Sequence, residues 1–455
     1  MIPVYEICRR AETGPIMRES EFDKRFLPNK IMELVKEYEI KYNPQEPVPT
    51  DDNMADDLFE AGKQLILDVG ILCTDTSRLI KFTDEEVKES LRAAPARAFV
   101  GSGRYLKEVV SRGVEDKTLP YLVSPPSGMP VSEDLATTIA QAFAQEELIE
   151  GYWTGTIQKL GGLPVKAGTP LEIRASRFEI TSAMEGFRKA GKADLPLVGG
   201  MTGLTSAARI ATLSPSCFRE GDCLTLSYVT EMKTDYRTLT QIESVLGHGT
   251  VNLMMDGTPI LRGIAGGPEG CAIALVAQEI ECFLFGVHLS GGGAVDIMTG
   301  TNTGRESAWA SDLFEIAMSR NTHCLETCYH FAAAGPCTEM LLYEATAKTI
   351  SAMTSGYEVL NIPNALAAGR ENYLTPLEFR LSCEIAHANL GMKRQDANAV
   401  LNELLPKYES QIRNAPKGKS FTECMNLETL APTHEWLNTY GKVKRELEEI
   451  GVAFE

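Results

Sequence analysis

The sequence predicts an α/β protein whose core is a parallel (βα)8 barrel, with extra helices before and after it. From about residue 119 to about residue 370, short apolar segments alternate with longer amphipathic ones, which is typical of strand–helix units. Most of the apolar segments end in glycine or polar residues, as strands do at the mouth of such a barrel. A doubly wound open sheet is the alternative, but no Gly-x-Gly-x-x-Gly follows a predicted strand.

Residues 1–118 are predicted to form a helical collar ahead of the barrel. One helix is expected over Lys30–Tyr42, and a second opens at Thr50-Asp51-Asp52 and runs to about Val69. Thr83-Asp-Glu-Glu86 is a capping box, so a third helix is expected to begin there.

Residues 119–370 are assigned to the barrel. A helix from Ser132 places apolar side chains four residues apart and should face a core. The predicted strands are Leu119–Ser124, Gly151–Ile157, Leu195–Val198, Leu224–Val229, Thr250–Met255, Phe283–His288 and Cys324–Phe331. The predicted helices between them are Glu172–Lys189, Tyr236–Leu246, Glu269–Cys282, Arg305–Ser319 and Cys337–Thr354.

Residues 371–455 are predicted to be a helical region packed on the barrel. Thr375-Pro-Leu-Glu378 combines a capping box with proline at the first helical position, which is a strong helix start. In the last helix one apolar stripe is made by Trp436, Tyr440, Val443, Leu447 and Ile450. The whole is a TIM-type barrel with additions at both ends of the chain.

Composition excludes several classes of protein. The net charge of −18 argues against nucleic acid as a partner, because phosphate binding needs a basic face. No apolar run reaches the length of a membrane span, and the N-terminus lacks a basic segment followed by a long apolar one. The 11 cysteines lack C-x-x-C pairs, which is typical of reduced thiols. We therefore expect a cytoplasmic protein with no membrane partner.

Four clusters of glycine and polar residues follow predicted strands and are the candidate site. They are expected to meet at one barrel mouth, because the C-terminal ends of parallel strands share one face. The clusters are Gly199–Gly203, Met254–Thr258, His288–Gly293 and Tyr329–Glu339.

The individual roles stay open from the residues alone. Asp256 could orient a cation or form an Asx turn before Gly257. His288 could be an acid or base, or could make a structural hydrogen bond. Tyr329 and Phe331 could give an aromatic wall for a cation, or could be ordinary strand residues.

Metal binding is a further alternative. His323, Cys324, Cys328 and His330 are close in sequence and carry ligands that suit zinc. If the segment is a strand, Cys324, Cys328 and His330 share one face and His323 takes the other. The more economical interpretation is buried cysteines beside a polar histidine, with no metal.

At these clusters the sequence resembles the monomethylamine:corrinoid methyltransferase family. The most specific match is Ala334-Gly-Pro-Cys-Thr-Glu-Met340, and Ile264–Glu269, Thr301–Thr303 and Gly418–Cys424 agree in order and spacing. The resemblance implies a (βα)8 barrel that forms symmetric oligomers. It also implies methyl transfer from a methylamine to the cobalt of a separate corrinoid protein docked at the barrel mouth.

The catalytic centre of the family does not carry over by the same resemblance. Its pyrrolysine falls at Gly199, and its two glutamates fall at Thr202 and Gly257. The glutamine and tyrosine of the family match Tyr329 and Phe331. The catalytic residues therefore stay unknown, and the cavity is expected to be less anionic and more apolar than in a relative that uses monomethylammonium. We also expect Gly199 to be small because of the ligand, with a negative φ that would tolerate alanine.

The sequence thus predicts a methyltransferase that works without pyrrolysine. The methyl donor would be an N-methylated amine, with a quaternary ammonium as one candidate, because such a donor leaves as a neutral amine. No tightly bound cofactor is expected, since a partner protein would supply the corrinoid (a cobalamin), and a homo-oligomer such as a hexamer is expected. The alternatives are a non-catalytic barrel that binds a ligand or a corrinoid protein, and zinc-assisted transfer from an alcohol or thiol. Substrate-binding roles are assigned to Gly199, Thr202, Asp256, Gly257, His288, Tyr329 and Phe331.

Overall fold

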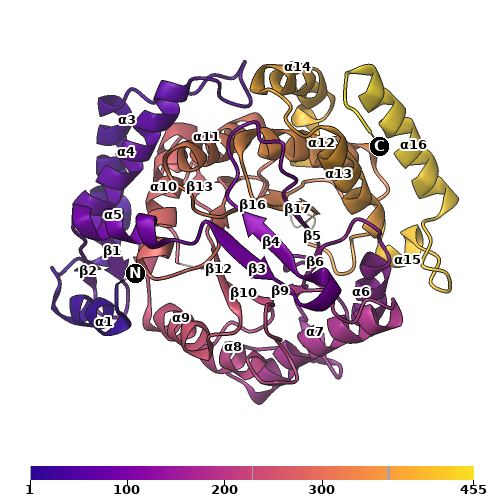
Figure 1. Ribbon diagram of the computed structural model, residues 1–455, viewed down its shortest axis with the longest axis horizontal. Helices are drawn as coiled ribbons and strands as arrows, with labels where there is room; N and C mark the ends of the chain where they lie inside the picture. Colours follow the sequence, from indigo (N-terminus) through magenta and orange to yellow (C-terminus); the bar gives the residue numbers. More distant parts are fainter. Residues whose placement is uncertain (1, 228, 366–368, 455) are drawn as a thin grey trace.

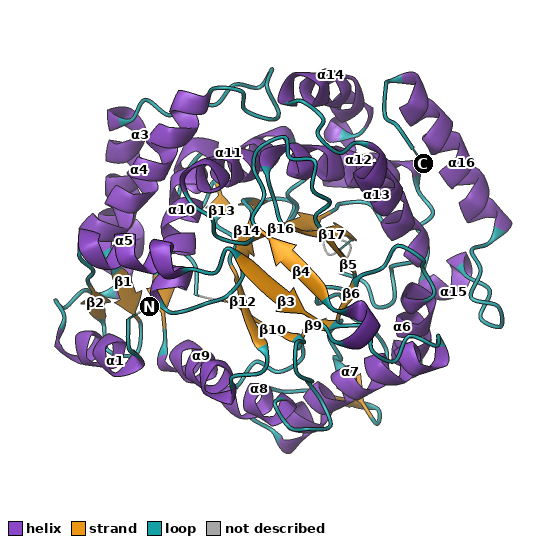
Figure 2. Cartoon of the chain, in the orientation of Figure 1, coloured by secondary structure: helices purple, strands orange, loops and turns teal. Residues whose placement is uncertain are grey.

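A computed structural model of the chain describes residues 2–227, 229–365 and 369–454. Its centre is a sheet of 8 parallel strands that follow one another around the sheet in chain order (Figures 1 and 2). Bridges between Met254 and Leu289 and between Gly257 and Gly292 join the two outer strands, so the sheet closes into a barrel. The strands are β5 (Tyr121–Ser124), β6 (Gly151–Trp153), β9 (Leu197–Gly199), β10 (Cys223–Ser227), β12 (Asn252–Asp256), β14 (Ser290–Gly292), β16 (Glu326–Phe331) and β17 (Val359–Asn364).

Helices alternate with these strands and form the outer ring of the barrel (Figure 2). Side-chain caps stabilise the starts of some of them: Thr205 accepts from the Ala208 N–H at 3.3 Å, and Asp235 accepts from the Thr238 N–H at 2.7 Å. The ring consists of α6 (Ala136–Ala144), α7 (Pro170–Lys189), α8 (Ser206–Thr212), α9 (Tyr236–His248), α10 (Pro268–Leu284), α11 (Arg305–Asn321), α12 (Glu339–Ser355) and α13 (Pro376–Ala388).

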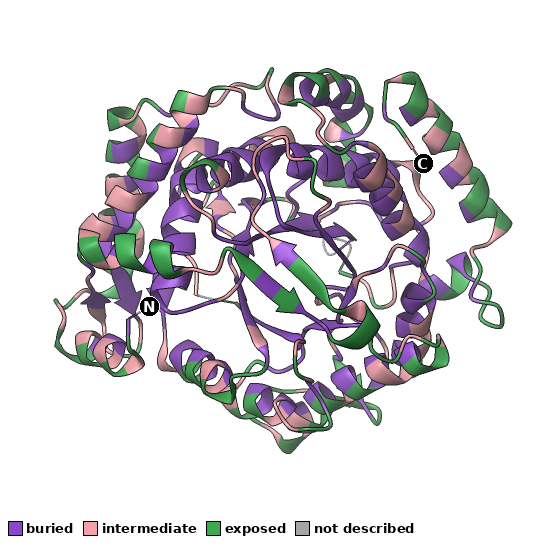
Figure 3. Ribbon diagram, viewed as in Figure 1, coloured by how far each residue is buried: buried purple, intermediate pink, exposed green. Residues whose placement is uncertain are grey.

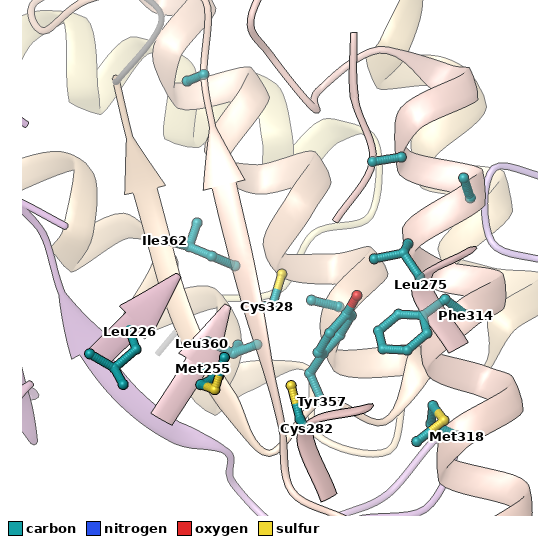
Figure 4. Close-up of a cluster of buried hydrophobic side chains, with 14 of the residues drawn as sticks. Leu226, Met255, Leu275, Cys282, Phe314, Met318, Cys328, Tyr357, Leu360 and Ile362 are labelled. Carbon is teal, nitrogen blue, oxygen red and sulfur yellow. The ribbon is translucent and has the colours of Figure 1, made fainter. Parts of the chain in front are cut away.

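The outer face of the barrel and the inner faces of the helices share one large hydrophobic core. Figure 4 shows part of it, where side chains of β10, β12, β16 and β17 meet side chains of α10 and α11. Both faces of every barrel strand are therefore covered, which accounts for the continuous apolar runs in the sequence. The labelled residues of this part are Leu226, Met255, Leu275, Cys282, Phe314, Met318, Cys328, Tyr357, Leu360 and Ile362.

A hairpin closes the N-terminal end of the barrel. Strands β3 (Arg97–Val100) and β4 (Lys107–Val110) pair antiparallel and cross the barrel axis in Figure 1. Val100 and Val109 join the apolar cluster that fills the barrel interior. The Gly101 N–H donates to the Gly221 carbonyl just before β10, so the hairpin is attached to the starts of the strands. Its other face is exposed in Figure 3. We call β3 and β4 with residues 101–106 the plug.

The two ends of the chain add helices on the outside. The C-terminal additions are α14 (Arg394–Leu404), α15 (Phe421–Cys424) and α16 (His434–Glu449). Among the described residues, no helix has both the length and the apolar character that a membrane span requires. The N-terminal additions are α1 (Val4–Thr13), α2 (Glu19–Glu21), α3 (Leu27–Glu37), α4 (Asp52–Val69) and α5 (Asp84–Ala93), with β1 (Ile71–Cys73) and β2 (Arg78–Ile80).

Three sequence expectations about elements are wrong. Phe283–His288 is not a strand, since its first residues end α10 and the strand is Ser290–Gly292, a Ser-Gly-Gly segment with no apolar signal. The last barrel strand, Val359–Asn364, is missing from the prediction because proline and asparagine interrupt its apolar run. The collar also contains strands as well as helices.

Candidate active site at the barrel mouth

The C-terminal end of the barrel interior is open to solvent. Side chains that face inward alternate along each strand, and the last of them on β10, β12 and β16 are Ser227, Asp256 and Phe331. Ser227 is exposed, and Asp256 and Phe331 are partly buried. One step deeper, Met254 and Tyr329 are fully buried and form the floor. These strand ends are the mouth, as the sequence predicts for its strand-end clusters.

One side of the mouth is aromatic. Tyr329 stacks on Phe331 with 6.3 Å between ring centroids and meets Trp153 edge-on at 5.3 Å. The Tyr329 hydroxyl lies 3.7 Å from the Met254 sulfur. Faces of aromatic rings attract cations, and methylated ammonium groups bind well to such walls because they shed water easily.

The other side of the mouth carries a carboxyl group. The Ser227 hydroxyl donates to Asp256 at 2.7 Å. Burial raises the pKa of Asp256 to about 6, although this hydrogen bond and the positive charge of Arg209 act to lower it. The carboxyl is thus charged at neutral pH and can face a cation.

The glycine-rich segment after β9 is held in place by a buried glutamate. Glu179, on α7, accepts the Met201 N–H at 2.6 Å and the Thr202 N–H at 2.7 Å, and also binds the Thr154 hydroxyl. Burial raises the pKa of Glu179, and these hydrogen bonds oppose that rise. The Thr202 hydroxyl accepts the Ile157 N–H at 3.0 Å. Thr202 is therefore a structural link in this loop.

Gly199 is required by the backbone, which corrects the expectation of a negative φ. Its φ is +124°, a conformation that side-chain-bearing residues rarely adopt. A Cβ at Gly199 would lie 2.4 Å from the Thr154 hydroxyl oxygen and 3.0 Å from the Thr154 backbone nitrogen. The position therefore excludes a side chain for structural reasons, whatever else occupies the mouth.

Gly257 and His288 lie in the wall between β12 and β14. The Gly257 N–H donates to the Gly291 carbonyl at 3.1 Å, so Gly257 follows β12 at the mouth and completes the closure. His288 accepts the Leu253 N–H at 3.0 Å, near the start of β12. Burial lowers the pKa of His288. His288 thus makes the structural hydrogen bond that was one of its two predicted alternatives, near the start of β12.

The cysteines and histidines of residues 323–330 lie in different parts of the barrel wall. His323 hydrogen-bonds the Ala94 carbonyl at 2.8 Å, near the other end of the barrel. Cys328 and His330 face outward from the barrel into the buried helical layer, and burial lowers the pKa of His330 to about 3. In the ranges that the structure describes, no group of three or more His, Cys, Asp or Glu side chains is arranged to hold a metal ion.

Sequence reasoning missed three polar residues at the mouth: Glu179, Arg209 and Ser227. Glu179 comes from the middle of α7, far from any glycine-rich cluster, and no local signal marks it. Arg209 had a signal, since it is the one charged residue in the short helix Ser206–Thr212 that follows the glycine-rich turn. It is only 7% exposed, and its Nη1 has no hydrogen-bond partner among the described residues.

The fold and the mouth define a (βα)8-barrel protein whose site lies at the C-terminal ends of the strands, a class dominated by enzymes. The comparisons with known proteins narrow this class. The profile of the family described as monomethylamine methyltransferase MtmB matches residues 2–452. The chain belongs to this family and is a methyltransferase.

The relatives cover almost the whole chain. A monomethylamine methyltransferase MtmB of Methanosarcina mazei is 31% identical over 453 residues, covering 99% of this chain and 98% of the relative. MtmB1 of Methanosarcina acetivorans is 30% identical with the same coverage. The crystal structure of Methanosarcina barkeri MtmB superposes with a TM-score of 0.96 at 29% identity, again covering 99% and 98% of the two chains.

Proposed function

We propose that this protein transfers a methyl group from an N-methylated amine to the cobalt of a separate corrinoid protein, without pyrrolysine. The observation that carries the proposal is a mouth lined by Tyr329, Phe331 and Asp256 in a chain of the methyltransferase family. The corrinoid is the methyl acceptor and belongs to the partner protein, so no tightly bound cofactor is required of this chain.

The chemistry explains why a cation is the expected donor. The reduced cobalt attacks the methyl carbon, the carbon–nitrogen bond breaks, and its electron pair leaves with the nitrogen. A methylated ammonium gives a neutral amine in this step, so no residue must stabilise a negative leaving group. The chain must only bind and orient the cation. A quaternary ammonium satisfies this requirement without an adduct, and Gly199 offers no side chain for one.

The mouth can bind both the methyl groups and the positive charge of a methylated ammonium. The aromatic pair Tyr329 and Phe331 suits the methyl groups, and the Asp256 carboxylate offsets the positive charge. Solvent reaches Ser227, Asp256 and Phe331, so a ligand can enter from the side on which the acceptor must also approach.

The rim of the mouth suits a protein partner. Leu204, Ile297 and Met298 lie in loops that follow barrel strands, and Leu163 lies in a short hairpin between β6 and α7. In the order Leu163, Leu204, Ile297 and Met298, they are 61%, 56%, 57% and 67% exposed. Exposed apolar side chains that gather around a site are typical of protein–protein contacts. We propose that the corrinoid protein docks on this rim, which we define by these four residues. We further propose a cytoplasmic homo-oligomer, with a hexamer as one arrangement.

A spectroscopic assay tests the function. The purified protein is mixed with the reduced corrinoid protein and with mono-, di-, tri- and tetramethylated ammonium compounds, and methyl-cobalt is followed by its absorbance. We expect methyl-cobalt from the more highly methylated compounds and little or none from monomethylamine. Efficient turnover of monomethylamine would show that another residue replaces the electrophile of the family.

The same assay distinguishes a methyltransferase from the alternative of a non-catalytic barrel. Such a protein would bind a methylated ammonium or the corrinoid protein and yet produce no methyl-cobalt with any donor. Omission of the protein is the background control, because free reduced cobalt reacts slowly with strong methyl donors.

A further inference from the structure

Arg209 is a buried cation at the mouth, and its Nη1 has no hydrogen-bond acceptor among the residues that the structure describes. It lies on α8, immediately after the segment 199–205, and is 7% exposed. Its Nη1 lies 3.1 Å from the place that a Cβ would take at Gly200, so the tip of the guanidinium borders the loop at the end of β9. Its charge interacts most strongly with the Glu179 carboxyl and, after that, with Asp256 at the end of β12. The guanidinium thus borders the end of β9, and β10 and then β12 follow β9 in the sheet.

The obvious structural partner is already engaged. Both oxygens of Glu179 accept hydrogen bonds from Thr154, Met201 and Thr202. The Asp256 oxygen that is bound within the protein accepts from Ser227. Nη1 of Arg209 meanwhile has no acceptor in the described part of the chain. A buried guanidinium donor without an acceptor is costly, and native proteins seldom keep one unless a ligand or solvent satisfies it.

We propose that Arg209 binds a carboxylate of the substrate, so that the methyl donor is a zwitterion: an N-methylated amino acid rather than a simple methylamine. This inference rests on the proposed function. The guanidinium would hold the carboxylate, and Tyr329, Phe331 and Asp256 would receive the methylated ammonium at the other end of the molecule.

The chemistry of the groups favours a carboxylate. A guanidinium offers paired N–H donors in a plane, which match the two oxygens of a carboxylate. Arg209 would then face the anionic end of the substrate, and Asp256 with the aromatic rings would face its cationic end. Binding at two points also orients the molecule, so that one N-methyl group is directed outward to the acceptor.

Ligand binding in the absence of the corrinoid protein tests this inference directly. N-trimethylated amino acids of increasing chain length are titrated calorimetrically, beside their methyl esters and the amino alcohols of equal length. We expect the carboxylates to bind about tenfold or more tightly than the esters, the size of one charged hydrogen bond. Arg209→Gln should abolish that preference while leaving ester binding unchanged.

Two further variants serve as controls. Arg237→Gln removes an exposed arginine of α9 that pairs with Asp235 at 3.3 Å, and it should keep the preference for carboxylates. Arg209→Lys keeps the charge without the planar fork and should retain only part of the preference. If Arg209→Gln does not fold, Arg209→Lys decides the question by itself.

Three outcomes would overturn the inference. Equal affinity of acid and ester would show that Arg209 does not select a carboxylate. If Arg209→Gln weakened the binding of the acid and of the ester equally, Arg209 would have only a structural role. Binding of acetate as tight as that of the amino acids would make it a simple anion site. A clear preference for carboxylates without methyl-cobalt from any donor would instead contradict the proposed function while leaving the binding specificity intact.

Discussion

The two ends of the barrel differ in what fills them. At the N-terminal end, the plug inserts Val100 and Val109 into the barrel interior, and both are almost fully buried. At the C-terminal end, the last inward-facing side chains are Ser227, Asp256 and Phe331, and solvent reaches all of them. One end is packed like a protein core and the other is left open.

The difference shows where stability and chemistry are separated. The side chains that the plug inserts into the barrel, such as Val100 and Val109, are apolar and buried, so changes to them should cost free energy of unfolding. The mouth keeps groups that a folded protein would otherwise avoid, namely a carboxyl with a raised pKa in Asp256 and an unpaired donor in Arg209. Changes to these groups should cost activity and spare stability.

The largest expected effect is at the plug. Val100→Asp places a charge without a partner in the barrel interior and should lower the free energy of unfolding by about 4 kcal/mol. Phe99→Asp is the matched control, because Phe99 is the neighbouring residue and is 54% exposed, so it should change stability by about 0.5 kcal/mol or less. Denaturant unfolding measures both. Similar losses in the two variants would contradict the burial of the plug.

The second-largest expected loss of stability is at Gly199. This residue is an exception to the separation of stability and chemistry between the two ends, because it lies at the mouth and yet has a structural role. Gly199→Ala adds a Cβ at a φ of +124° and 2.4 Å from the Thr154 oxygen. We expect a loss of about 2–4 kcal/mol from strain and overpacking together. Gly162→Ala, at a φ of +77° with nothing within 4 Å of the added atom, isolates the strain and should cost about 1 kcal/mol. Equal losses would show that Thr154 moves away freely.

At Asp256, unlike at the plug and at Gly199, a substitution should weaken ligand binding and leave stability unchanged. Asp256→Asn is expected to weaken binding of a methylated ammonium about tenfold or more, since it removes the opposing charge. In the wild type, binding should strengthen as the pH rises through about 6, where the carboxyl ionises, and Asp256→Asn should remove this dependence. Calorimetric titrations between pH 5 and 8 provide the measurement.

The stability of the same variant has a defined sign. The folded-state pKa of Asp256 is raised from 3.8 to about 6, so the native state is protonated more readily than the unfolded chain. The contribution of Asp256 to wild-type stability should therefore fall as the pH rises from about 4 to 6. Asp256→Asn should be at least as stable as the wild type at pH 7, and a marked loss of stability there would contradict a functional role.

The smallest effect concerns the rim. Leu204→Asp or Ile297→Asp should weaken docking of the corrinoid protein several-fold, seen as a higher partner concentration for half-maximal methyl transfer. Leu106→Asp, in the plug at the opposite end and 50% exposed, is the control and should change nothing. An equal effect of all three would point to general electrostatic repulsion of the partner.

The barrel was largely predictable because its signals are local. Helix starts such as Thr83–Glu86 and Thr375–Glu378 carry capping boxes that the structure contains, and most strands are apolar runs of the expected length. β14 and β17 escaped prediction because their strand character comes from neighbouring strands and not from Ser-Gly-Gly or from a segment that contains Pro363.

The site was less predictable because its key relations are long-range. Asp256, Tyr329 and Phe331 could be placed at the mouth from the strand pattern alone. The space for a side chain at Gly199 is limited by Thr154 on another strand connection, and the position of the loop depends on Glu179 on α7. The same holds for His288, whose partner Leu253 belongs to the adjacent strand.

The central claim is that the plug end of the barrel serves stability and the mouth serves chemistry. Its most direct test is the rate of methyl-cobalt formation per folded molecule in Asp256→Asn and Val109→Ala. Unfolding is measured on the same preparations. We expect that Asp256→Asn unfolds like the wild type and transfers methyl groups about tenfold or more slowly. Val109→Ala should lose stability by about 1–3 kcal/mol and transfer at the wild-type rate. A Val109→Ala protein that is stable but slow, or an Asp256→Asn protein that is unstable but fully active once folded, would contradict this claim.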